Sequence, residues 1–525
     1  MLVIANKSYI QLGFATLDFI VIIVYLTAVA WLGVRIAGKQ TSTSDYFLGG
    51  QDIPWWAVLF SVVATETSTL TFISIPAVAY GGNLTFLQIT LGYIVGRILV
   101  SIYFLPKYYE GNLSTAYQFI GRRFGPSMRN ATSSTFMITR LLADGVRLFA
   151  TAIPLAIILR LGGAFTGWGD LEIYLLSITA ISTITLIYTL IGGIKAVVWM
   201  DVMQMGVYIG GAILAAGIMI NGLQGGLSGA LALASDAGKT QLFDFGFEQS
   251  FAEFIAQPYT FFTALIGGAI FSVASHGTDQ LIVQRLLTTR NLQNSQKALV
   301  WSGVIVAFQF ALFLGIGLLL YGFYNAQSPD ALGLATMDEI FAKFIVEELP
   351  VGLSGLIVAA LFAAAMSSLS SSLNSLASST TLDLYKPYFG KENTEKEDLK
   401  ISRIITTVWA IILTGSAFLF AVLQLQEGER PAVVELGLGI ASYTYGGLLG
   451  AFVLGRWFEK PDKTDALIGF FAGLISLLFM VKGPIQNILP GEGLAIAWPL
   501  YTVVGSIIVV LVGNISVWIK NKFIT

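Results

Sequence analysis

A run of hydroxyl side chains around one carboxylate lies inside an otherwise apolar segment. Residues 64–71 read ATETSTLT and precede Pro76. A continuous helix in a membrane would turn these polar groups toward lipid on nearly every side, at a free-energy cost. A helix broken from Thr65 to Ser68 would instead free backbone carbonyls to coordinate a cation. The alternative is a hydroxyl-rich packing face that is hydrogen-bonded to its own backbone.

A second polar segment is rich in serine. Residues 364–375 read AAMSSLSSSLNS, and Ser367, Ser370 and Ser371 fall at i, i+3 and i+4, so that their hydroxyls share one helix face. Hydroxyl oxygens suit a hard cation such as Na⁺. Close helix packing through small residues is the alternative.

An acid that could meet these serines is Asp201, just inside another apolar segment. A buried carboxylate must be paired, protonated or bound to an ion. Lys195 is an alternative partner, but it lies six residues earlier and on a different helix face. The pattern therefore favours an ion site that is shared by Asp201 and the serines.

Further charges lie within apolar segments. Arg140, Asp144 and Arg147 are spaced i, i+4 and i+7, so they stack on one helix face and are typical of an internal ion-pair ladder. The single histidine, His276, is interpreted as a hydrogen-bonded structural residue, with a proton relay as the less favoured alternative.

Cys is absent. Disulfides, thiol catalysis and a two-histidine zinc centre are therefore excluded, and no nucleophile, base and metal set indicates an enzyme.

The elements that hold these residues are membrane helices. The 525 residues are 55% hydrophobic and 11% charged, with 29 Lys and Arg against 31 Asp and Glu, which predicts an integral membrane protein and no nucleic-acid partner. A span needs roughly 20 apolar residues. Thirteen such segments are expected at 17–37, 55–80, 86–106, 127–158, 173–191, 196–221, 258–282, 299–323, 351–381, 402–424, 432–455, 465–481 and 496–518.

The loops predict an orientation. Lys and Arg concentrate on the cytoplasmic side of membrane proteins. With thirteen spans and the N-terminus outside, most of the 29 Lys and Arg residues fall inside, and the C-terminus is inside too. We expect one membrane domain over residues 1–525 with no appended soluble domain, and a first span that is not a cleaved signal peptide.

Ordered motifs resemble those of a known family. They are DYFLGG at 45–50, IGGIKAVVWMDVMQ at 191–204, GTDQLIVQR at 277–285, the serine-rich span ending at 375, and SYTYGGLLG at 442–450. Together they resemble the sodium:solute symporter family, which includes bacterial sodium/galactose, proline and sialic acid transporters. The resemblance covers about residues 15 to 455 and depends on the ordered set, because each motif alone is weak.

The resemblance implies an all-α LeuT-type fold. We expect an extra N-terminal helix at 17–37, a five-helix repeat at 55–221, an inverted second repeat at 258–455, and two additional helices at 465–518. The spans that start near 55 and 258 would be the two broken helices.

The resemblance also implies sodium ligands. The family's general sodium site would use carbonyls of Ala64, Thr67 and Ala364 with hydroxyls of Ser367 and Ser368. A second sodium site, present in some members, would use Asp201 with Ser367, Ser370 and Ser371. Two Na⁺ ions per cycle are expected.

Substrate residues follow from the resemblance in the same way. They are Glu66, Ser68, Thr71, Phe86, Thr90, Arg147, Ser272 and Ser275. Glu66 departs from the sugar-transporting and sialic acid-transporting relatives, which have an amide or hydroxyl there, so galactose is not indicated as the solute. Arg147 resembles an arginine that meets a substrate carboxylate in sialic acid carriers; alternatively, it pairs with Glu66 or Asp144.

The sequence therefore predicts a sodium-coupled symporter in the plasma or inner membrane. It would import a small polar solute such as a sugar or sialic acid by alternating access, with membrane lipid around it and no obligate protein partner. A carrier of a small carboxylate or amino acid is the alternative. A channel, a uniporter or a transmembrane sensor is less favoured.

Overall fold

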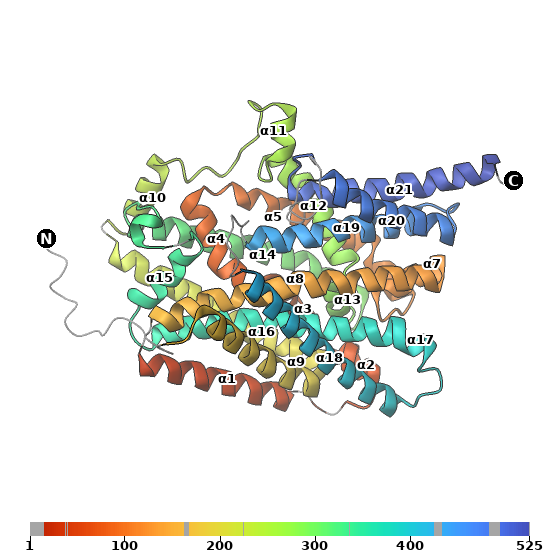
Figure 1. The fold of residues 1–525 in the computed structure, drawn as a ribbon, viewed down its shortest axis with the longest axis horizontal. Helices are drawn as coiled ribbons and strands as arrows, with labels where there is room; N and C mark the ends of the chain where they lie inside the picture. The colour runs from red at the N-terminus through yellow and green to blue at the C-terminus, as the bar shows by residue number, and fades with distance from the viewer. Residues whose placement is uncertain are drawn as a thin grey trace.

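The protein is a bundle of helices, most of which run roughly along the long axis of the molecule (Figure 1). The computed structural model describes residues 15–36, 38, 40–161, 167–223, 225–334, 336–424, 433–481 and 494–523. Within these ranges there is no β-strand, only one isolated bridge between Val481 and Leu494. The long helices are α1 (Thr16–Ile36), α5 (Gln88–Tyr103), α8 (Pro126–Leu161), α9 (Asp170–Gly222), α14 (Leu292–Phe323), α16 (Leu353–Ser379), α18 (Glu395–Gln424), α19 (Val433–Trp457), α20 (Lys463–Met480) and α21 (Trp498–Phe523).

Shorter helices join the long ones or lie at the ends of the bundle. They are α2 (Thr43–Leu48), α6 (Leu105–Glu110), α7 (Ala116–Phe124), α10 (Gly226–Asp236), α11 (Phe251–Ala256), α15 (Glu339–Glu347) and α17 (Lys386–Tyr388).

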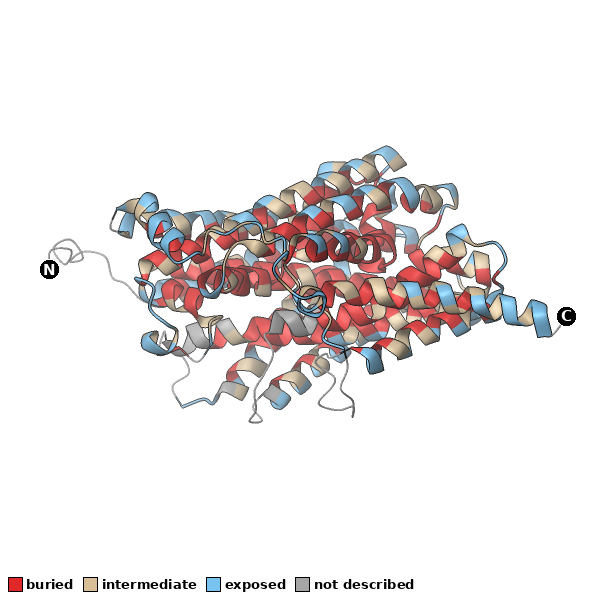
Figure 2. Ribbon diagram, turned by 90° about the horizontal axis from the view of Figure 1, so that it is seen from above, coloured by how far each residue is buried: buried red, intermediate tan, exposed pale blue. Residues whose placement is uncertain are grey.

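The helices have the length and composition of membrane spans. In the described ranges, nine are long and apolar enough to cross a membrane, and ten if one bent pair is a single span. Buried residues fill the centre of the bundle (Figure 2), while its outer faces carry exposed apolar side chains such as Ile23 and Ile411. Such faces suit lipid rather than water. The protein is therefore an all-helical, multi-pass membrane protein.

Each of the thirteen predicted spans overlaps a described helix, although the count of thirteen stays a prediction. Two predicted spans fall on α9, which is interrupted at Gly193 (φ 55°, ψ −156°). A Cβ at this residue would lie 2.5 Å from the carbonyl oxygen of Tyr46, so both the backbone conformation and the close contact require glycine.

The first predicted helix break is present. Helix α3 (Trp55–Glu66) ends one residue before Thr67 (φ −80°, ψ 109°), and α4 (Thr69–Gly81) begins after the extended Ser68 (φ −103°, ψ 174°). The helix is therefore broken at Thr67 and Ser68, in the second half of the predicted stretch from Thr65 to Ser68, while Thr65 and Glu66 remain helical.

A second break separates α12 (Phe261–Gly277) from α13 (Gln280–Leu286). Asp279 is extended there (φ −92°, ψ 122°), and its carboxylate caps α13 by accepting a hydrogen bond from the backbone N–H of Leu281 at 2.8 Å. An acidic cap suits the positive end of a helix dipole.

Glycines hold α12 tightly against α5. A Cβ at Gly96 would lie 2.4 Å from the carbonyl oxygen of Ala269, and one at Gly92 would lie 2.6 Å from that of Leu265. Small residues let membrane helices approach this closely. Helix α5 therefore fixes the position of the second broken helix.

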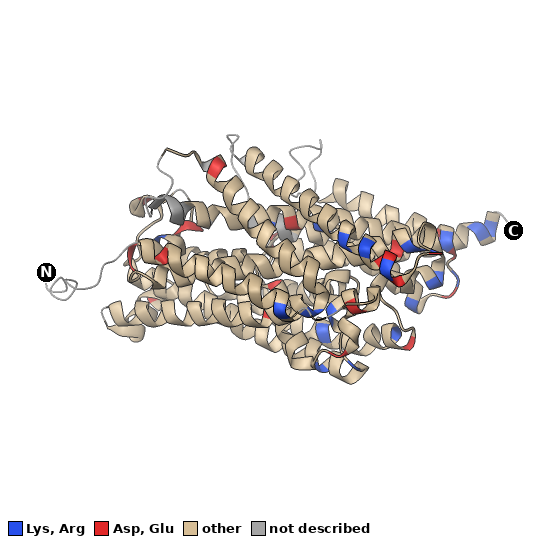
Figure 3. Ribbon diagram, turned by 90° about the horizontal axis from the view of Figure 1, so that it is seen from below, with Lys and Arg blue, Asp and Glu red and all other residues tan. Residues whose placement is uncertain are grey.

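Positive charge is distributed unevenly along the bundle. Lys and Arg gather in the half of the molecule in which α21 ends (Figure 3).

Candidate functional site

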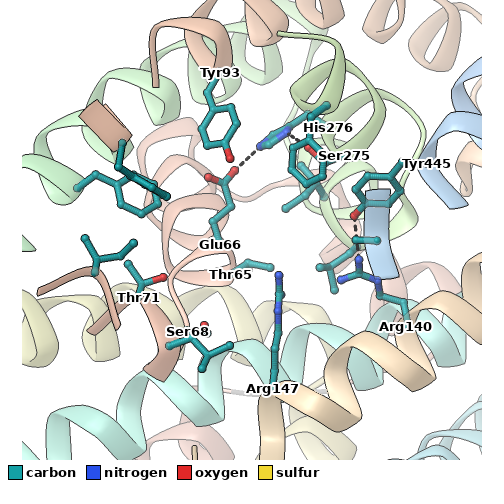
Figure 4. A pocket seen from close by; sticks show the side chains of 18 residues that line it. Thr65, Glu66, Ser68, Thr71, Tyr93, Arg140, Arg147, Ser275, His276 and Tyr445 are labelled. Carbon is teal, nitrogen blue, oxygen red and sulfur yellow. Dashed lines mark hydrogen bonds and ion pairs between the residues drawn. The ribbon is translucent and has the colours of Figure 1, made fainter. Parts of the chain in front are cut away.

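A cavity of about 120 Å³ lies between the two helix breaks (Figure 4). Six of the predicted substrate residues line it, namely Glu66, Ser68, Thr71, Phe86, Arg147 and Ser275. Thr90 and Ser272 are not among the lining residues. Their hydroxyls donate to the carbonyl oxygens of Leu87 at 2.7 Å and Tyr93 at 3.1 Å.

Glu66 forms a bridge between the breaks. Its carboxylate accepts hydrogen bonds from the guanidinium of Arg97 on α5 and from Nε2 of His276 on α12. The Arg97 side chain is 0% exposed and that of Glu66 is 22% exposed. His276 also contacts Ser275 through Nδ1 at 2.8 Å. Glu66 thus pairs with Arg97, and the alternative that it pairs with Arg147 is wrong.

The predicted ladder on α8 joins the second break. Arg140 lies 3.5 Å from Asp144 and 3.2 Å from Asp279, and it donates a hydrogen bond to the hydroxyl of Tyr445 at 2.8 Å. Tyr445 in turn donates to Asp279 at 2.6 Å. Helix α8 is therefore bonded directly to the cap of α13.

Arg147 is held more weakly than its neighbour. Its one ion pair in the described structure is with Asp144, at 3.8 Å, which is beyond hydrogen-bond distance. Its side chain is 19% exposed and extends into the cavity (Figure 4). A guanidinium has five donors in a planar fork that matches a carboxylate. Of the two arginines that line the cavity, Arg147 is the one without a close ion pair.

Two residues of the first predicted sodium site, Thr67 and Ser368, are in contact where α3 ends near α16. The hydroxyl of Ser368 donates to the carbonyl of Thr67 at 3.5 Å, across the first helix break. Ala64, Ala364 and Ser367 are all 0% exposed. The break therefore brings backbone and hydroxyl oxygens of two helices together, which are the ligands of a hard cation.

Of the second predicted site, Ser367 and Asp201 are in direct contact. Ser367 donates a hydrogen bond to Oδ1 of Asp201 at 2.7 Å. Ser370 and Ser371 donate to the carbonyl oxygen of Ser367 at 3.0 and 2.7 Å. Asp201 is 0% exposed, so its carboxylate is fully removed from solvent.

A cation that sequence reasoning did not assign to this site is Arg285, from α13. Its Nη2 lies 3.4 Å from Oδ2 of Asp201 and also contacts the hydroxyl of Ser371, and its Nε donates to Ser61 at 3.0 Å. Lys195, the partner considered from sequence, is exposed. The structure thus places a guanidinium beside Asp201, where the sequence predicts the second sodium ion.

Fold and site define the class. A multi-pass helical protein with two broken helices, a polar cavity between them and oxygen clusters beside the first break has the architecture of a cation-coupled transporter.

Comparisons with known proteins give the family. The model of the sodium:solute symporter family matches residues 46–473, and the chain belongs to this family. The sodium/sialic acid symporter NanT of Aliivibrio fischeri is 31% identical over 512 residues, which cover 96% of this chain and 93% of that protein. The sodium/glucose cotransporter of Vibrio parahaemolyticus is 27% identical, with 98% and 93% covered.

A solved structure agrees. The substrate-bound, outward-open state of a Na⁺-coupled sialic acid symporter matches with a TM-score of 0.80 at 27% identity, over 96% of this chain and 98% of that chain. The protein is therefore a sodium-coupled symporter and not an enzyme.

Proposed function

We propose that the protein imports a small anionic, hydroxyl-rich solute of the sugar-acid class, such as a sialic acid, together with Na⁺. The observation that carries this proposal is the guanidinium of Arg147, which reaches into the cavity and makes only a 3.8 Å ion pair. The hydroxyls of Ser68, Thr71 and Ser275 line the same cavity and suit the hydroxyls of a sugar. NanT, which shares 31% identity, is a sodium/sialic acid symporter.

Charge balance around the two breaks supports an anion. Four carboxylates there face four guanidiniums, so the region is neutral when His276 is neutral. They are Glu66, Asp144, Asp201 and Asp279 with Arg97, Arg140, Arg147 and Arg285. An added Na⁺ leaves a net positive charge in a medium of low dielectric, and a solute carboxylate cancels it. Each ligand therefore favours binding of the other, which is the thermodynamic basis of coupling.

For the ions, we propose Na⁺ at the carbonyls of Ala64, Thr67 and Ala364 with the hydroxyls of Ser367 and Ser368. A second Na⁺ would bind at Asp201, Ser367, Ser370 and Ser371, to give two ions per solute. Because the guanidinium of Arg285 already contacts this carboxylate, the second ion enters only as that guanidinium moves away.

For the topology, we propose thirteen spans with the N-terminus outside, and two inverted five-helix repeats at 55–221 and 258–455 in a single transport domain. The concentration of Lys and Arg in the half where α21 ends supports a cytoplasmic C-terminus (Figure 3). A membrane with a sodium gradient, the plasma or inner membrane, is the proposed location.

A ligand screen on the purified chain tests the solute class. A ligand at 100 times its Kd adds about 2.7 kcal/mol to the stability of the protein it binds. We expect N-acetylneuraminic acid to raise the melting temperature in Na⁺ but not in K⁺, while its methyl ester and galactose raise it far less. A small carboxylate or amino acid that stabilises better would instead favour the alternative class of solute.

A pair of variants tests the role of Arg147. Arg147→Gln removes a charged donor whose hydrogen bonds contribute about 1.5–3 kcal/mol, so the Kd should rise by roughly 10-fold to 100-fold. Arg147→Lys keeps the charge and should lose less. Equal binding of acid and methyl ester by the wild type would refute the proposal. The sodium-to-solute flux ratio in proteoliposomes then measures the stoichiometry.

A further inference from the structure

A second recess, far in the fold from the cavity, lies beside the first turns of α18. It encloses about 540 Å³ between α18, the kinked region of α9 and the segment that precedes α2. We call it the basic recess. Its polar lining residues are Gln40, Thr41, Lys396, Lys400, Arg403 and Thr407.

Three cations of the basic recess share one helix face. Lys396, Lys400 and Arg403 are spaced i, i+4 and i+7 on α18, which places them in one row. None of the three makes an ion pair in the described part of the chain. Like charges in such a row repel one another. An anion would relieve this repulsion.

The nearby carboxylates bind elsewhere. Glu395 and Asp398 contact Lys386 at 3.5 and 2.7 Å. Glu397 accepts hydrogen bonds from the backbone N–H and hydroxyl of Thr394 at the start of α18. Asp45 lies next to the lining residue Thr41, and its carboxylate accepts hydrogen bonds from the backbone N–H and hydroxyl of Thr41 at 3.1 and 2.8 Å. The described acids near the basic recess therefore bind other partners and form no ion pair with its three cations.

Hydrogen-bonding atoms inside the basic recess are also unpartnered. The Nε of Arg403 is buried without a hydrogen-bond partner, and so are both polar atoms of the Gln40 amide. A buried polar atom without a partner costs free energy, and such atoms in native proteins commonly indicate a missing ligand, water or ion. Both residues line the basic recess, and they come from different segments of the chain.

An apolar surface continues from the basic recess along α18. Ile404 lines the basic recess and is 53% exposed, and Ile411, two turns further along the helix, is 67% exposed. The half-buried Leu190 of α9 is also part of the lining. A ligand with a charged end in the basic recess would thus have apolar surface on which to lay a hydrocarbon chain.

We propose that the basic recess binds an anionic glycerophospholipid, with its phosphate at Lys396, Lys400 and Arg403 and an acyl chain along Ile404 and Ile411. Basic pockets between membrane helices bind such headgroups, and polybasic segments at the membrane surface attract anionic lipid. The phosphate accepts the free Nε–H of Arg403. This site is separate from the solute cavity, because the two share no lining residue.

Lipid exchange into the full-length chain tests the proposal. The purified protein is placed in phosphatidylcholine nanodiscs with or without phosphatidylglycerol, and lipids that remain bound are counted by native mass spectrometry after release into detergent. Each basic residue near an anionic surface contributes on the order of five-fold to binding. The triple variant Lys396→Gln, Lys400→Gln, Arg403→Gln should therefore lose about 100-fold in phosphatidylglycerol affinity.

Matched variants separate this site from general surface charge. A control triple variant removes three exposed cations outside the basic recess and should retain the bound lipid. It combines Lys391→Gln, Lys460→Gln and Lys463→Gln. Thr407→Trp keeps every charge but fills the basic recess, and should lose the lipid. Glycerol 3-phosphate and inorganic phosphate are tested as ligands in the same way, because they supply the phosphate group without acyl chains.

The outcomes are distinct. The site is supported if the wild type selectively retains phosphatidylglycerol, both recess variants lose it, and the control triple variant keeps it. Equal loss from recess and control variants overturns it, as does retention of lipid by Thr407→Trp. Binding of glycerol 3-phosphate that is as tight as binding of phosphatidylglycerol also overturns the proposal, because the ligand is then a soluble phosphate.

Discussion

Glu66→Gln should destabilise the protein because, among the described residues, Glu66 is the one anion that contacts Arg97. The Arg97 side chain is 0% exposed, and its Nε and Nη1 have no hydrogen-bond partner, so its charge is compensated through Nη2 and Glu66. Removal of one partner from a buried ion pair costs about 3–5 kcal/mol. Since the Glu66 side chain is 22% exposed, we expect the lower end of that range, about 3 kcal/mol.

The double variant distinguishes charge compensation from loss of shape. Replacement of a buried ion pair by apolar groups of similar volume is often neutral. Arg97→Met combined with Glu66→Gln removes both charges, and the amide introduced at residue 66 keeps His276 as a hydrogen-bond partner, so stability should recover to within about 1 kcal/mol of the wild type. His276 keeps a hydrogen-bond partner at residue 66 in both backgrounds, so the cycle reports the Glu66–Arg97 pair.

The free energy of unfolding is measured by denaturant titration of the detergent-solubilised protein, followed by Trp fluorescence. Arg97→Met alone completes the double-mutant cycle. If Glu66→Gln alone unfolds at the same denaturant concentration as the wild type, Arg97 does not depend on Glu66. If the double variant is no more stable than Glu66→Gln, the loss arises from packing and not from charge.

Three further substitutions test other parts of the site. Ser367→Ala removes the 2.7 Å hydrogen bond to Asp201, so the Na⁺ concentration for half-maximal uptake should rise about 10-fold. Ser402→Ala is the buried control. An unchanged sodium dependence of uptake in Ser367→Ala would contradict the proposed ion sites. Gly96→Ala places a methyl group 2.4 Å from a carbonyl oxygen and should cost about 1–3 kcal/mol of stability. Gly217→Ala, whose methyl group would meet nothing within 4 Å, should be neutral. Equal effects of the two substitutions on stability would contradict the tight α5–α12 contact. Tyr445→Phe removes the hydroxyl that bridges Arg140 and Asp279 but leaves their direct 3.2 Å ion pair, and it should lower stability by about 1–3 kcal/mol. The exposed Tyr103→Phe is the control, and an unchanged melting temperature would show that the hydroxyl adds nothing to the contact between α8 and α13.

The sequence predicts those parts of the site that depend on local pattern. The polar run near Thr67 cannot continue as a lipid-facing helix, so the break between α3 and α4 follows from composition. The shared face of Ser367 and Ser371 follows from helical periodicity, and Asp201 does meet Ser367.

Pairings between distant segments could not be predicted in this way. Arg285 lies 84 residues after Asp201, and position in the sequence does not show that a short helix after the second break carries it back to that carboxylate. The pairing of Glu66 with Arg97 also depends on the contact between helices, although an arginine inside an apolar span is itself a signal of a buried partner.

Register explains the two predicted solute residues that do not line the cavity. Thr90 and Ser272 lie on helices that border it, but the close α5–α12 contact turns the hydroxyl of Ser272 to the carbonyl of Tyr93. Which face of a helix points inward is decided by its neighbours, here by Gly92 and Gly96. A family resemblance alone does not show this orientation.

The position of Arg285 connects the sodium stoichiometry to the energy source of transport. If its guanidinium stays 3.4 Å from Asp201, the second site already holds a cation, and one Na⁺ with a monovalent anion crosses without net charge. If Arg285 moves away and a second Na⁺ replaces it, each cycle carries one positive charge inward. The membrane potential then adds about 2.3 kcal/mol per 100 mV to the sodium gradient. Under the proposed two-ion scheme, movement of Arg285 decides whether uptake responds to voltage.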